Sequence, residues 1–538
     1  MSNLLRCRIK SYIQPFERKL ALAELEALTG QEPQLLSEST GDGLEYIVTA
    51  DLPIADLAGK LAYWETVSQD RRILTTQALR EATINVVRNG VQIDQIEWFL
   101  TLNLESSIPN RRCLRYGPHG IHEYRGRFFP QLVRSLINIA QVPQGGIVAD
   151  PMSGSGTTAV EAVLSGCHGI GLDMNPLSVL MGQTKCALLA VDPDEIINAY
   201  RGICDQLTGV SAIPSAVPIY FETLPADDQQ YLRTWFSEQV LGDLNRIAAA
   251  IRSTSVSTTV RDLMRLSLSN VLRSVSWQKD ADLRVRKEIN LDVDIDPISV
   301  FLKELHRSAK AVLSLLYYNR HIPIGTFEIL EGDARALPLL WRKWLGRADA
   351  VITSPPYATA LPYLDTDRLS LSYLGLLHRR GQRARDQEMI GNREVTDKKR
   401  KGYWQYFIEH QGTLPQSVTA LIEKIEQLNS ATEVGFRRKN LPALLAKYFL
   451  DMRGVLSGIA QILKPGAAAY VVVGDNHTIA GGERVDIETS SLLIDVAEMV
   501  GLEEGEHIPM EMLVSRDIFK KNAVASEVIL CLRRPKDS

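Results

Sequence analysis

The chain has 538 residues, a formal net charge of −4, 45% hydrophobic residues and 23% charged residues. This length allows roughly two to four domains, and the composition is ordinary for a folded soluble protein. No run of about 18 apolar residues occurs, which excludes a membrane-spanning helix and a membrane partner. The charged start of the chain also lacks the apolar centre of a signal peptide, so we expect a cytoplasmic protein.

The cysteines are scattered along the chain without any CxxC pair. They are Cys7, Cys113, Cys167, Cys186, Cys204 and Cys531. We therefore expect neither a zinc site nor a disulfide framework, and no metal.

Residues 1–110 predict a small α+β module. An amphipathic helix spans 15–29 and ends at Gly30, and the stretches 45–53 and 90–100 bracket further helix-forming sequence. We find no catalytic pattern in this module, so we assign it a scaffolding or substrate-recognition role. A second helix follows at 130–139, with Leu132, Leu136 and Ile137 on one face.

Residues 147–176 predict a βαβ unit. An apolar run leads into a turn of Gly and Ser at 150–158, a helix follows, and a second apolar run ends at Asp173. Small residues let the backbone approach a ligand at the carboxyl end of the first strand, and Asp173 can accept hydrogen bonds from ribose hydroxyls. The turn is not GxGxxG, it lacks the lysine of a P-loop, and Asp150 would repel a phosphate. A cationic nucleoside without phosphate fits this turn, and S-adenosylmethionine is the common one.

Residues 189–323 predict a helical insert, because four helical patterns follow one another and the segment is too long for a plain connection in a compact sheet. The insert could cap the cofactor, which we favour, or contact nucleic acid. The second reading would use Arg273, Lys279, Arg284, Arg286 and Lys287.

The sheet resumes after the insert. A strand at 326–331 leads to Asp333, and a strand at 348–353 delivers Ser354-Pro355-Pro356-Tyr357 to its carboxyl end, where doubly wound sheets place their ligands. Further strands are expected at 468–474 and 524–533.

Two of these motifs carry a family resemblance. The turn Asp150-Pro-Met-Ser-Gly-Ser-Gly-Thr-Thr resembles the cofactor loop of the S-adenosylmethionine-dependent DNA amino-methyltransferases of the TSPPY type, and Thr353 to Tyr357 resembles their catalytic motif. The resemblance covers about 120–181 and 326–535. It implies an α/β fold, the class I methyltransferase Rossmann-like doubly wound sheet, formed by 111–188 and 324–538, with the insert 189–323 and the module 1–110 added.

The resemblance also implies a cofactor site for S-adenosyl-L-methionine. The segment at 122–137 is similar to the family's segment beside the methionine part of the cofactor, and Asp333 matches the acceptor for the adenine amino group. The implied cofactor residues are Tyr124, Arg127, Phe129, Asp150, Pro151, Ser153, Gly154, Ser155, Gly156, Thr157, Asp173 and Asp333. Many members with a Ser-Pro-Pro motif carry their motifs in the opposite order, so the resemblance leaves the target-recognition region unplaced.

Ser354, Pro355, Pro356 and Tyr357 are the predicted catalytic residues. An exocyclic amine is a poor nucleophile because its lone pair is delocalised into the ring. The Ser354 hydroxyl and the Pro355 carbonyl can accept both amine hydrogens, proline offers no competing donor, and Tyr357 can stack on the base. Ser in the first position resembles the members that methylate cytosine at N4, whereas Asp is more usual in those acting on adenine N6.

The net charge requires a local basic patch for any contact with nucleic acid. Residues 378–402 carry nine Lys and Arg against four Asp and Glu, within a segment, 358–447, that could recognise the target. The expected partner is double-stranded DNA, whose target base would be flipped out of the helix, and a cognate restriction endonuclease is a candidate partner. The predicted DNA-binding residues are Arg379, Arg380, Arg383, Arg385, Lys398, Lys399, Arg400 and Lys401.

Three other readings stay open at this point. One is a DNA adenine-N6 methyltransferase. Another is a tRNA guanine-N2 methyltransferase, favoured by the N-terminal module and the motif order. The third is a catalytically silent nucleic-acid-binding subunit that keeps the fold.

Overall fold

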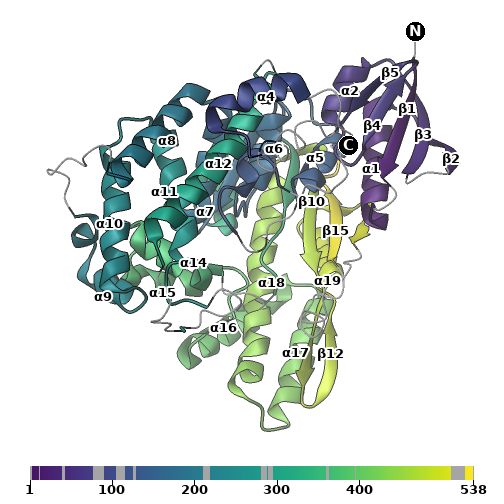
Figure 1. Ribbon diagram of the computed structural model, residues 1–538. Coiled ribbons are helices and arrows are strands. Elements are labelled where there is room, and N and C mark those ends of the chain that lie inside the picture. Colours follow the sequence, from purple (N-terminus) through teal and green to yellow (C-terminus); the bar gives the residue numbers. More distant parts are fainter. Residues whose placement is uncertain are drawn as a thin grey trace.

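The central sheet of the computed structural model is mostly parallel and carries the motifs at the carboxyl ends of its strands (Figure 1). The strand order is β13-β15-β10-β9-β6-β7-β8, with β14 paired to β15. Strands β10, β9, β6, β7 and β8 run parallel, and β15 runs antiparallel to β10. The strands are β6 (Ile147–Asp150), β7 (His168–Asp173), β8 (Thr326–Glu331), β9 (Ala348–Thr353), β10 (Leu463–Gly474), β13 (Glu503–Glu504), β14 (Ile508–Met510) and β15 (Glu527–Arg533).

This arrangement confirms the predicted fold class, a class I methyltransferase sheet with a small N-terminal α+β sheet added. The strand residues come from 147–173 and 326–533, in agreement with the predicted split around a helical insert, although the exact domain boundaries stay predictions. The structure describes residues 3–10, 13–38, 43–76, 86, 90–103, 115–124, 126, 129–209, 219–279, 287–288, 295–320, 322–358, 363–393, 395–510 and 527–536. Arg127, Arg284 and Arg286 lie outside these residues.

Alternation along the strands divides the core into two layers. Val148, Ile352 and Val472 pack on one face against α1 (Pro15–Thr29) and α5 (Pro130–Ile139). Their neighbours Ala149, Val351 and Val471 face the other layer. That layer contains α18 (Phe436–Ile462) and α19 (Thr489–Met499). Successive strand side chains point to opposite faces, so a buried parallel sheet needs apolar residues at every position.

The N-terminal segment forms a five-stranded antiparallel sheet with the order β2-β3-β1-β4-β5. Buried Glu24 on α1 accepts hydrogen bonds from the backbone of Ala62 (3.1 Å) and Tyr63 (3.2 Å) and from Asn138 on α5 (3.1 Å), which joins this sheet to the central one. Its elements are β1 (Asn3–Lys10), β2 (Gln34–Glu38), β3 (Gly43–Ala50), α2 (Ile54–Lys60), β4 (Thr66–Gln69) and β5 (Arg72–Thr75).

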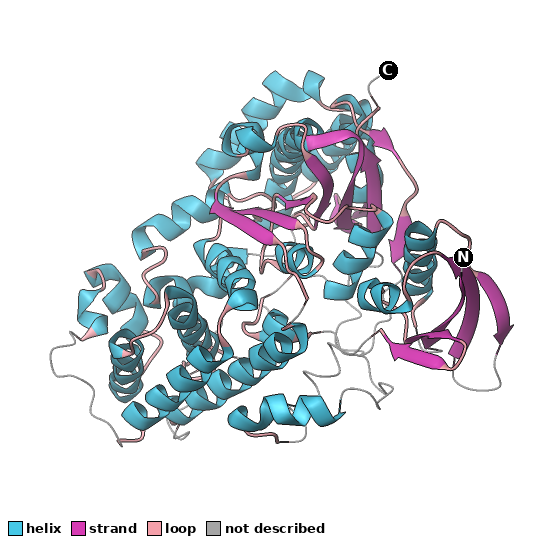
Figure 2. Cartoon of the chain, turned by 90° about the horizontal axis from the view of Figure 1, so that it is seen from above, coloured by secondary structure: helices cyan, strands magenta, loops and turns pink. Residues whose placement is uncertain are grey.

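The later part of the predicted module, α4 (Ile96–Asn103), packs on α12 (Pro297–Asn319) of the helical insert rather than on this sheet. The five-stranded sheet and the insert lie on opposite sides of the molecule (Figure 2). No helix within the described ranges is long and apolar enough to cross a bilayer.

The insert is helical, as predicted, and shares a core with helices on both sides of it in the sequence. Leu177 of α7 (Pro176–Ala187), Leu263 of the insert and Leu371 of α14 (Tyr363–Tyr373) belong to one apolar cluster. The insert helices are α8 (Pro193–Leu207), α9 (Ala226–Arg233), α10 (Glu238–Ser253), α11 (Thr258–Leu272) and α12 (Pro297–Asn319).

Between α14 and α18 the structure describes three further α-helices: α15 (Arg379–Glu388), α16 (Asp397–His410) and α17 (Gln416–Ser430). Helices α16 and α17 pack on α18, and α17 also contacts the hairpin β11 (Asn476–Ala480) and β12 (Glu483–Ile487). Figure 1 shows that α17 and this hairpin extend away from the central sheet.

Candidate active site

A cavity of about 250 Å³ lies where β6, β7, β8 and β9 end. It brings together most of the predicted site residues from the cofactor and catalytic motifs. These are Tyr124, Phe129, Pro151, Ser153, Gly154, Ser155, Thr157, Asp173, Ser354, Pro355, Pro356 and Tyr357. Asp150, Gly156 and Asp333 are not among the lining residues.

The cofactor loop has its shape because two of its positions tolerate no side chain. Gly154 has φ +48°, and a Cβ there would lie 2.8 Å from the ring of Tyr124. Gly156 has φ +81°, and a Cβ there would lie 2.6 Å from the Cα of Gly182 on α7. Positive φ favours glycine, so the loop turns sharply and starts α6 (Thr157–Leu164) directly behind the cavity.

Asp150 is buried beneath the cavity and connects the two motifs. Its Oδ1 accepts hydrogen bonds from the Thr353 hydroxyl (2.7 Å) and from the Met152 amide (3.2 Å). Burial raises its pKa to about 6. Asp150 is outside the cavity lining and holds Thr353, the residue before Ser354, against the loop. Its predicted contact with the cofactor stays a prediction.

Asp173 does line the cavity. Its carboxylate accepts hydrogen bonds from the amides of Gly154 (2.8 Å) and Asn175 (2.8 Å), and burial raises its pKa to about 6. A carboxylate can accept about four hydrogen bonds, so acceptor capacity remains for ligand hydroxyls.

The cavity suits S-adenosylmethionine. Its wall combines the thioethers of Met152 and Met174 and the ring of Phe129 with the carboxylate of Asp173. Among the residues that the structure describes, no lysine or arginine lines it. Such a wall offers no cation to a phosphate but accommodates a nucleoside that carries a positive charge.

Lys185 supports the loop from behind and was not predicted. It is 1% exposed, and its Nζ donates to the Ser155 carbonyl at 2.9 Å. A buried lysine needs such a partner.

The catalytic motif forms an open turn after β9. The Ser354 hydroxyl donates to the carbonyl of Val472 on β10 at 3.2 Å. The Tyr357 hydroxyl donates to Glu527, the first residue of β15, and Glu527 also lines the cavity. Glu527 lies 170 residues beyond Tyr357, and no local pattern marks it.

Helices outside the central sheet hold the cavity's flanks. Ser269 and Asn270 of α11 bond to His122 (2.9 Å) and to the Glu123 amide (2.9 Å), just before Tyr124. Asp367 of α14 accepts from Asn175 at 2.8 Å.

Asp333 begins a short helical turn and accepts from the Arg335 amide at 2.9 Å. Its carboxylate also binds the Arg335 guanidinium. Burial would raise its pKa, but these contacts with Arg335 lower it. Its neighbours Gly332 and Ala334 line the cavity, so the backbone here is close to the ligand space although the Asp333 carboxylate is bound elsewhere.

The predicted DNA-binding residues do not form one surface. On α15, Arg379 lies over the Tyr231 ring (4.3 Å) and Arg380 pairs with Asp227. Arg385 donates to the Met174 carbonyl (2.5 Å) and to Glu331 (2.8 Å), which places it at the cavity rim rather than on an outer face.

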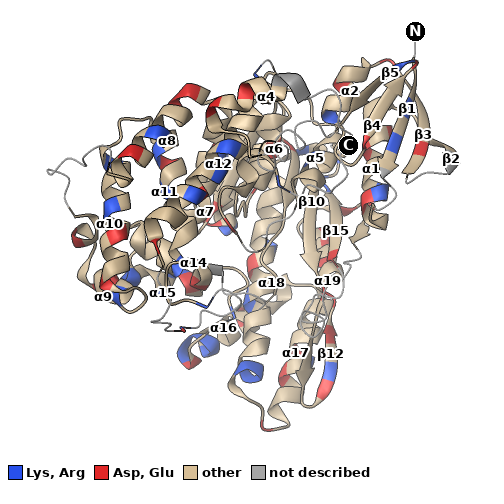
Figure 3. Ribbon diagram, viewed as in Figure 1, with Lys and Arg blue, Asp and Glu red and all other residues tan. Residues whose placement is uncertain are grey.

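Helix α16 carries the remaining basic side chains on its first turns (Figure 3). Arg400 and Lys401 pair with Asp397 of the same helix at 2.8 Å and 3.5 Å. Lys398 and, on α15, Arg383 are exposed, and Lys399 is partly exposed.

The chain has recognisable relatives. Residues 122–184 match the family model described as "RMKL-like, methyltransferase domain". Type II methyltransferase M.BsoBI of Geobacillus stearothermophilus is 25% identical over 413 residues, which cover 70% of this chain and 79% of that protein. Type II methyltransferase M.MvaI of Kocuria varians is 25% identical over 270 residues, 48% of this chain and 58% of that protein.

Among solved structures, TrmN from Thermus thermophilus shares 11% identity over 98% of this chain and 99% of that chain, with a TM-score of 0.31. A TM-score this low supports no conclusion about the fold, which rests on the strand order described above. The family match and the two relatives, together with the cavity, establish the enzyme class: the chain is an S-adenosylmethionine-dependent methyltransferase and a distant relative of type II DNA methyltransferases.

Proposed function

We propose that the protein transfers a methyl group to the N4 amine of cytosine in double-stranded DNA, as the modification enzyme of a restriction–modification system. One observation carries the proposal: Ser354, Pro355, Pro356 and Tyr357 line the same cavity as the cofactor loop and Asp173. The relatedness to type II methyltransferases supports DNA as the substrate and a restriction endonuclease as the functional partner.

The cofactor site follows from the lining residues. Bound S-adenosylmethionine supplies an electrophilic methyl group on a positively charged sulfur. Asp173 accepts the ribose hydroxyls, and Tyr124 and Phe129 bound the space on the side of the 122–129 segment. The loop from Pro151 to Thr157 approaches with its backbone, while Asp150 and Gly156 keep that loop in shape.

Ser354 acts as a hydrogen-bond acceptor. Its own proton points to the Val472 carbonyl, so the lone pairs of Oγ are available to an amine in the cavity. Together with the Pro355 carbonyl, this oxygen accepts both amine hydrogens. The nitrogen lone pair thereby leaves conjugation with the ring and points at the methyl group.

Tyr357 stacks on the target base, and Glu527 holds its ring in place through the hydroxyl. Near-attack positioning of this kind contributes up to ~7 to 11 kcal/mol in well-oriented systems, so these contacts account for a large share of the catalysis. Flipping the base into the cavity costs a few kcal/mol, which stacking and edge contacts offset.

Lys398, Lys399 and Lys401 of α16 and Arg383 of α15 contact the DNA phosphates in this proposal, because they are at least partly exposed. Arg379, Arg380, Arg400 and Lys401 each have a partner within the protein at present, which they would exchange for a phosphate.

The proposal is tested by incubating the protein and tritiated S-adenosylmethionine with unmethylated DNA and, separately, with bulk tRNA, followed by nucleoside analysis. We expect N4-methylcytosine in DNA. N6-methyladenine would retain the enzyme class and overturn the role given to Ser354, and methylguanine in tRNA alone would overturn the DNA substrate.

A further inference from the structure

The segment Gln387–Gly391, called here the connecting segment, lies between the two halves of the active site. Met389 and Ile390 line the cavity. Gly391 has φ +75°, and a Cβ there would lie 2.9 Å from Pro356 Cβ and 2.9 Å from the Tyr357 carbonyl oxygen. One short segment therefore borders both the cofactor space and the Ser-Pro-Pro-Tyr turn, and it leads on to the basic helix α16.

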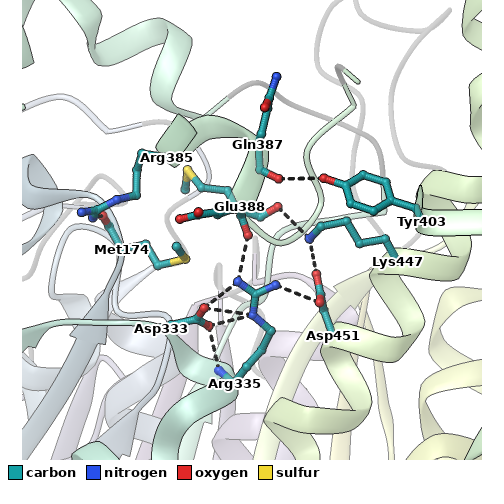
Figure 4. Close-up of polar contacts among 10 residues, drawn as sticks. Met174, Asp333, Arg335, Arg385, Gln387, Glu388, Tyr403, Lys447 and Asp451 are labelled. Atoms are coloured by element: carbon teal, nitrogen blue, oxygen red, sulfur yellow. Dashed lines mark hydrogen bonds and ion pairs between the residues drawn. The ribbon is translucent and has the colours of Figure 1, made fainter. Parts of the chain in front are cut away.

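Donors from three elements bind the backbone carbonyls of this segment. Arg335, which follows β8, donates to the Glu388 carbonyl at 3.0 Å. Tyr403 of α16 donates to the Gln387 carbonyl at 3.1 Å, and Lys447 of α18 lies 3.5 Å from the Met389 carbonyl. Figure 4 shows these side chains converging on the end of α15.

Arg335 is the centre of this group. Its guanidinium binds both oxygens of Asp333 and, at 2.9 Å, the carboxylate of Asp451 on α18, while Nη2 also donates to the Glu388 carbonyl. The planar guanidinium carries its five donors on three nitrogens held in a rigid fork, and Arg335 uses all three nitrogens for these contacts. A lysine side chain has a single nitrogen, which cannot lie within hydrogen-bond distance of every acceptor that this fork spans.

Arg385 holds the segment from its other end. It donates to the carbonyl of Met174, the residue directly after Asp173, and to the carboxylate of Glu331 at the end of β8. The two arginines thus connect the ends of β7 and β8 to α15 from opposite directions.

We propose that Arg335 is a positioning residue, which sets the connecting segment against the cofactor cavity and the Ser-Pro-Pro-Tyr turn at the same time. The link to methyl transfer rests on the function proposed above for that turn. The link to cofactor binding does not depend on the identity of the methylated base.

The test compares Arg335→Lys with the wild-type chain. Lysine keeps the charge but cannot reach all three acceptors. We expect the Kd for S-adenosylhomocysteine, measured by calorimetry, to rise about tenfold, since hydrogen bonds to charged groups contribute on that scale. Hydrogen exchange of the amides at 387–391 and 357 should accelerate, while exchange in β6 and β10 stays slow. Saturation with S-adenosylhomocysteine should restore part of the protection.

Arg233→Lys is the matched control, because Arg233 forms an ion pair with Glu238 on the outer helices, far from the cavity in sequence and contacts. It should leave binding and exchange unchanged. Asp451→Asn is a milder second variant that weakens the same junction, and it should change both readouts in the same direction by a smaller amount.

Unchanged S-adenosylhomocysteine binding together with unchanged exchange at 387–391 in Arg335→Lys would overturn the inference. Faster exchange across the whole sheet would also overturn it, because that pattern indicates a general loss of stability. Neither readout uses a methyl acceptor, so a failure of the proposed cytosine specificity would be seen separately.

Discussion

The cofactor loop and the basic helices α15 and α16 differ in how deeply their polar side chains are buried. In the loop, Asp150 and Ser155 are at most 2% exposed, and both side chains have hydrogen-bond partners within the protein. On the basic helices, the side chains of Arg380 and Lys401 are 86% and 72% exposed, and their ion pairs are with nearby carboxylates. Buried polar groups have one set of partners, because an unmatched group is costly, whereas exposed ion pairs contribute little and exchange readily.

From this difference we infer where substitutions should impair binding and catalysis most. Changes around the cavity should have large and specific effects, and changes on the basic helices should have small, additive and salt-dependent effects. Five predictions, in order of decreasing effect, test that contrast.

Ser354→Ala should lower kcat by roughly 100- to 1,000-fold, the scale seen when one oriented hydrogen-bonding group is lost from a transition state. Its affinity for S-adenosylhomocysteine should stay within about twofold of wild type, because the hydroxyl faces Val472 and the acceptor base rather than Asp173. Single-turnover methyl transfer and calorimetry measure the two quantities. Equal activity in the variant would remove Ser354 from the mechanism.

Asp173→Ala should weaken S-adenosylhomocysteine binding by about 10- to 100-fold, since hydrogen bonds to a charged acceptor contribute about 1.5 to 3 kcal/mol. The loss includes the hydrogen bond from the Gly154 amide that shapes the loop. Calorimetry gives the value, with Arg233→Lys as the control. Wild-type affinity would mean that the ribose is held elsewhere.

The pH dependence of the free energy of unfolding should reveal the raised pKa of Asp150. Its pKa is raised from 3.8 to about 6 by burial, so the folded state holds its proton more tightly than the unfolded state does. The resulting stabilisation is complete below pH 3.8 and is lost as the pH rises through about 6. This amounts to at most about 3 kcal/mol. The difference in Tm between Asp150→Asn and wild type should therefore grow in the variant's favour from pH 4 to pH 7.

Glu161 provides the contrast to Asp150. Burial would raise its pKa, but Arg134 and His119 lower it from 4.5 to about 2. Its contribution is present above pH 4.5 and is lost as the pH falls towards 2. The Tm of Glu161→Gln should therefore lie below that of wild type at neutral pH and approach it at low pH. If the Tm differences of Asp150→Asn and Glu161→Gln changed with pH in the same direction, the opposite pKa shifts would be contradicted.

Replacing Lys398, Lys399 and Lys401 together by alanine should weaken DNA binding severalfold, because each lysine that neutralises a phosphate releases counterions when the complex forms. The slope of log K against log salt should become shallower by about 0.9 for each phosphate that is no longer neutralised. Fluorescence anisotropy over a salt series measures both. Lys343→Ala, which removes a lysine paired with Glu328 at the far edge of β8, is the matched control. An unchanged slope in the triple variant would exclude this surface of α16 from the DNA interface.

Arg385 shows most clearly how the cofactor loop and the basic helices differ. Its neighbours in the sequence are basic, but its contacts are with residues at the cavity. The run at 378–402 predicted a DNA contact from charge alone. The structure shows a guanidinium bound to the Met174 carbonyl and Glu331. Charge density along the chain cannot indicate which arginines turn inward, since that depends on carbonyls and carboxylates more than 50 residues away.

Local patterns in the sequence are enough to predict the βαβ unit and the position of Ser354 to Tyr357 at a strand end, because strand periodicity, glycine turns and proline restrictions act over a few neighbouring residues. The doubly wound sheet was expected from the family resemblance of those two motifs. Only the tertiary structure decided that Asp150 holds Thr353, that Glu527 holds Tyr357 and that Arg335 joins Asp333, Asp451 and Glu388. Apart from Asp333 with Arg335, which are two residues apart, these pairs link distant parts of the chain. A buried polar atom finds such a partner through the packing of whole elements rather than through local pattern.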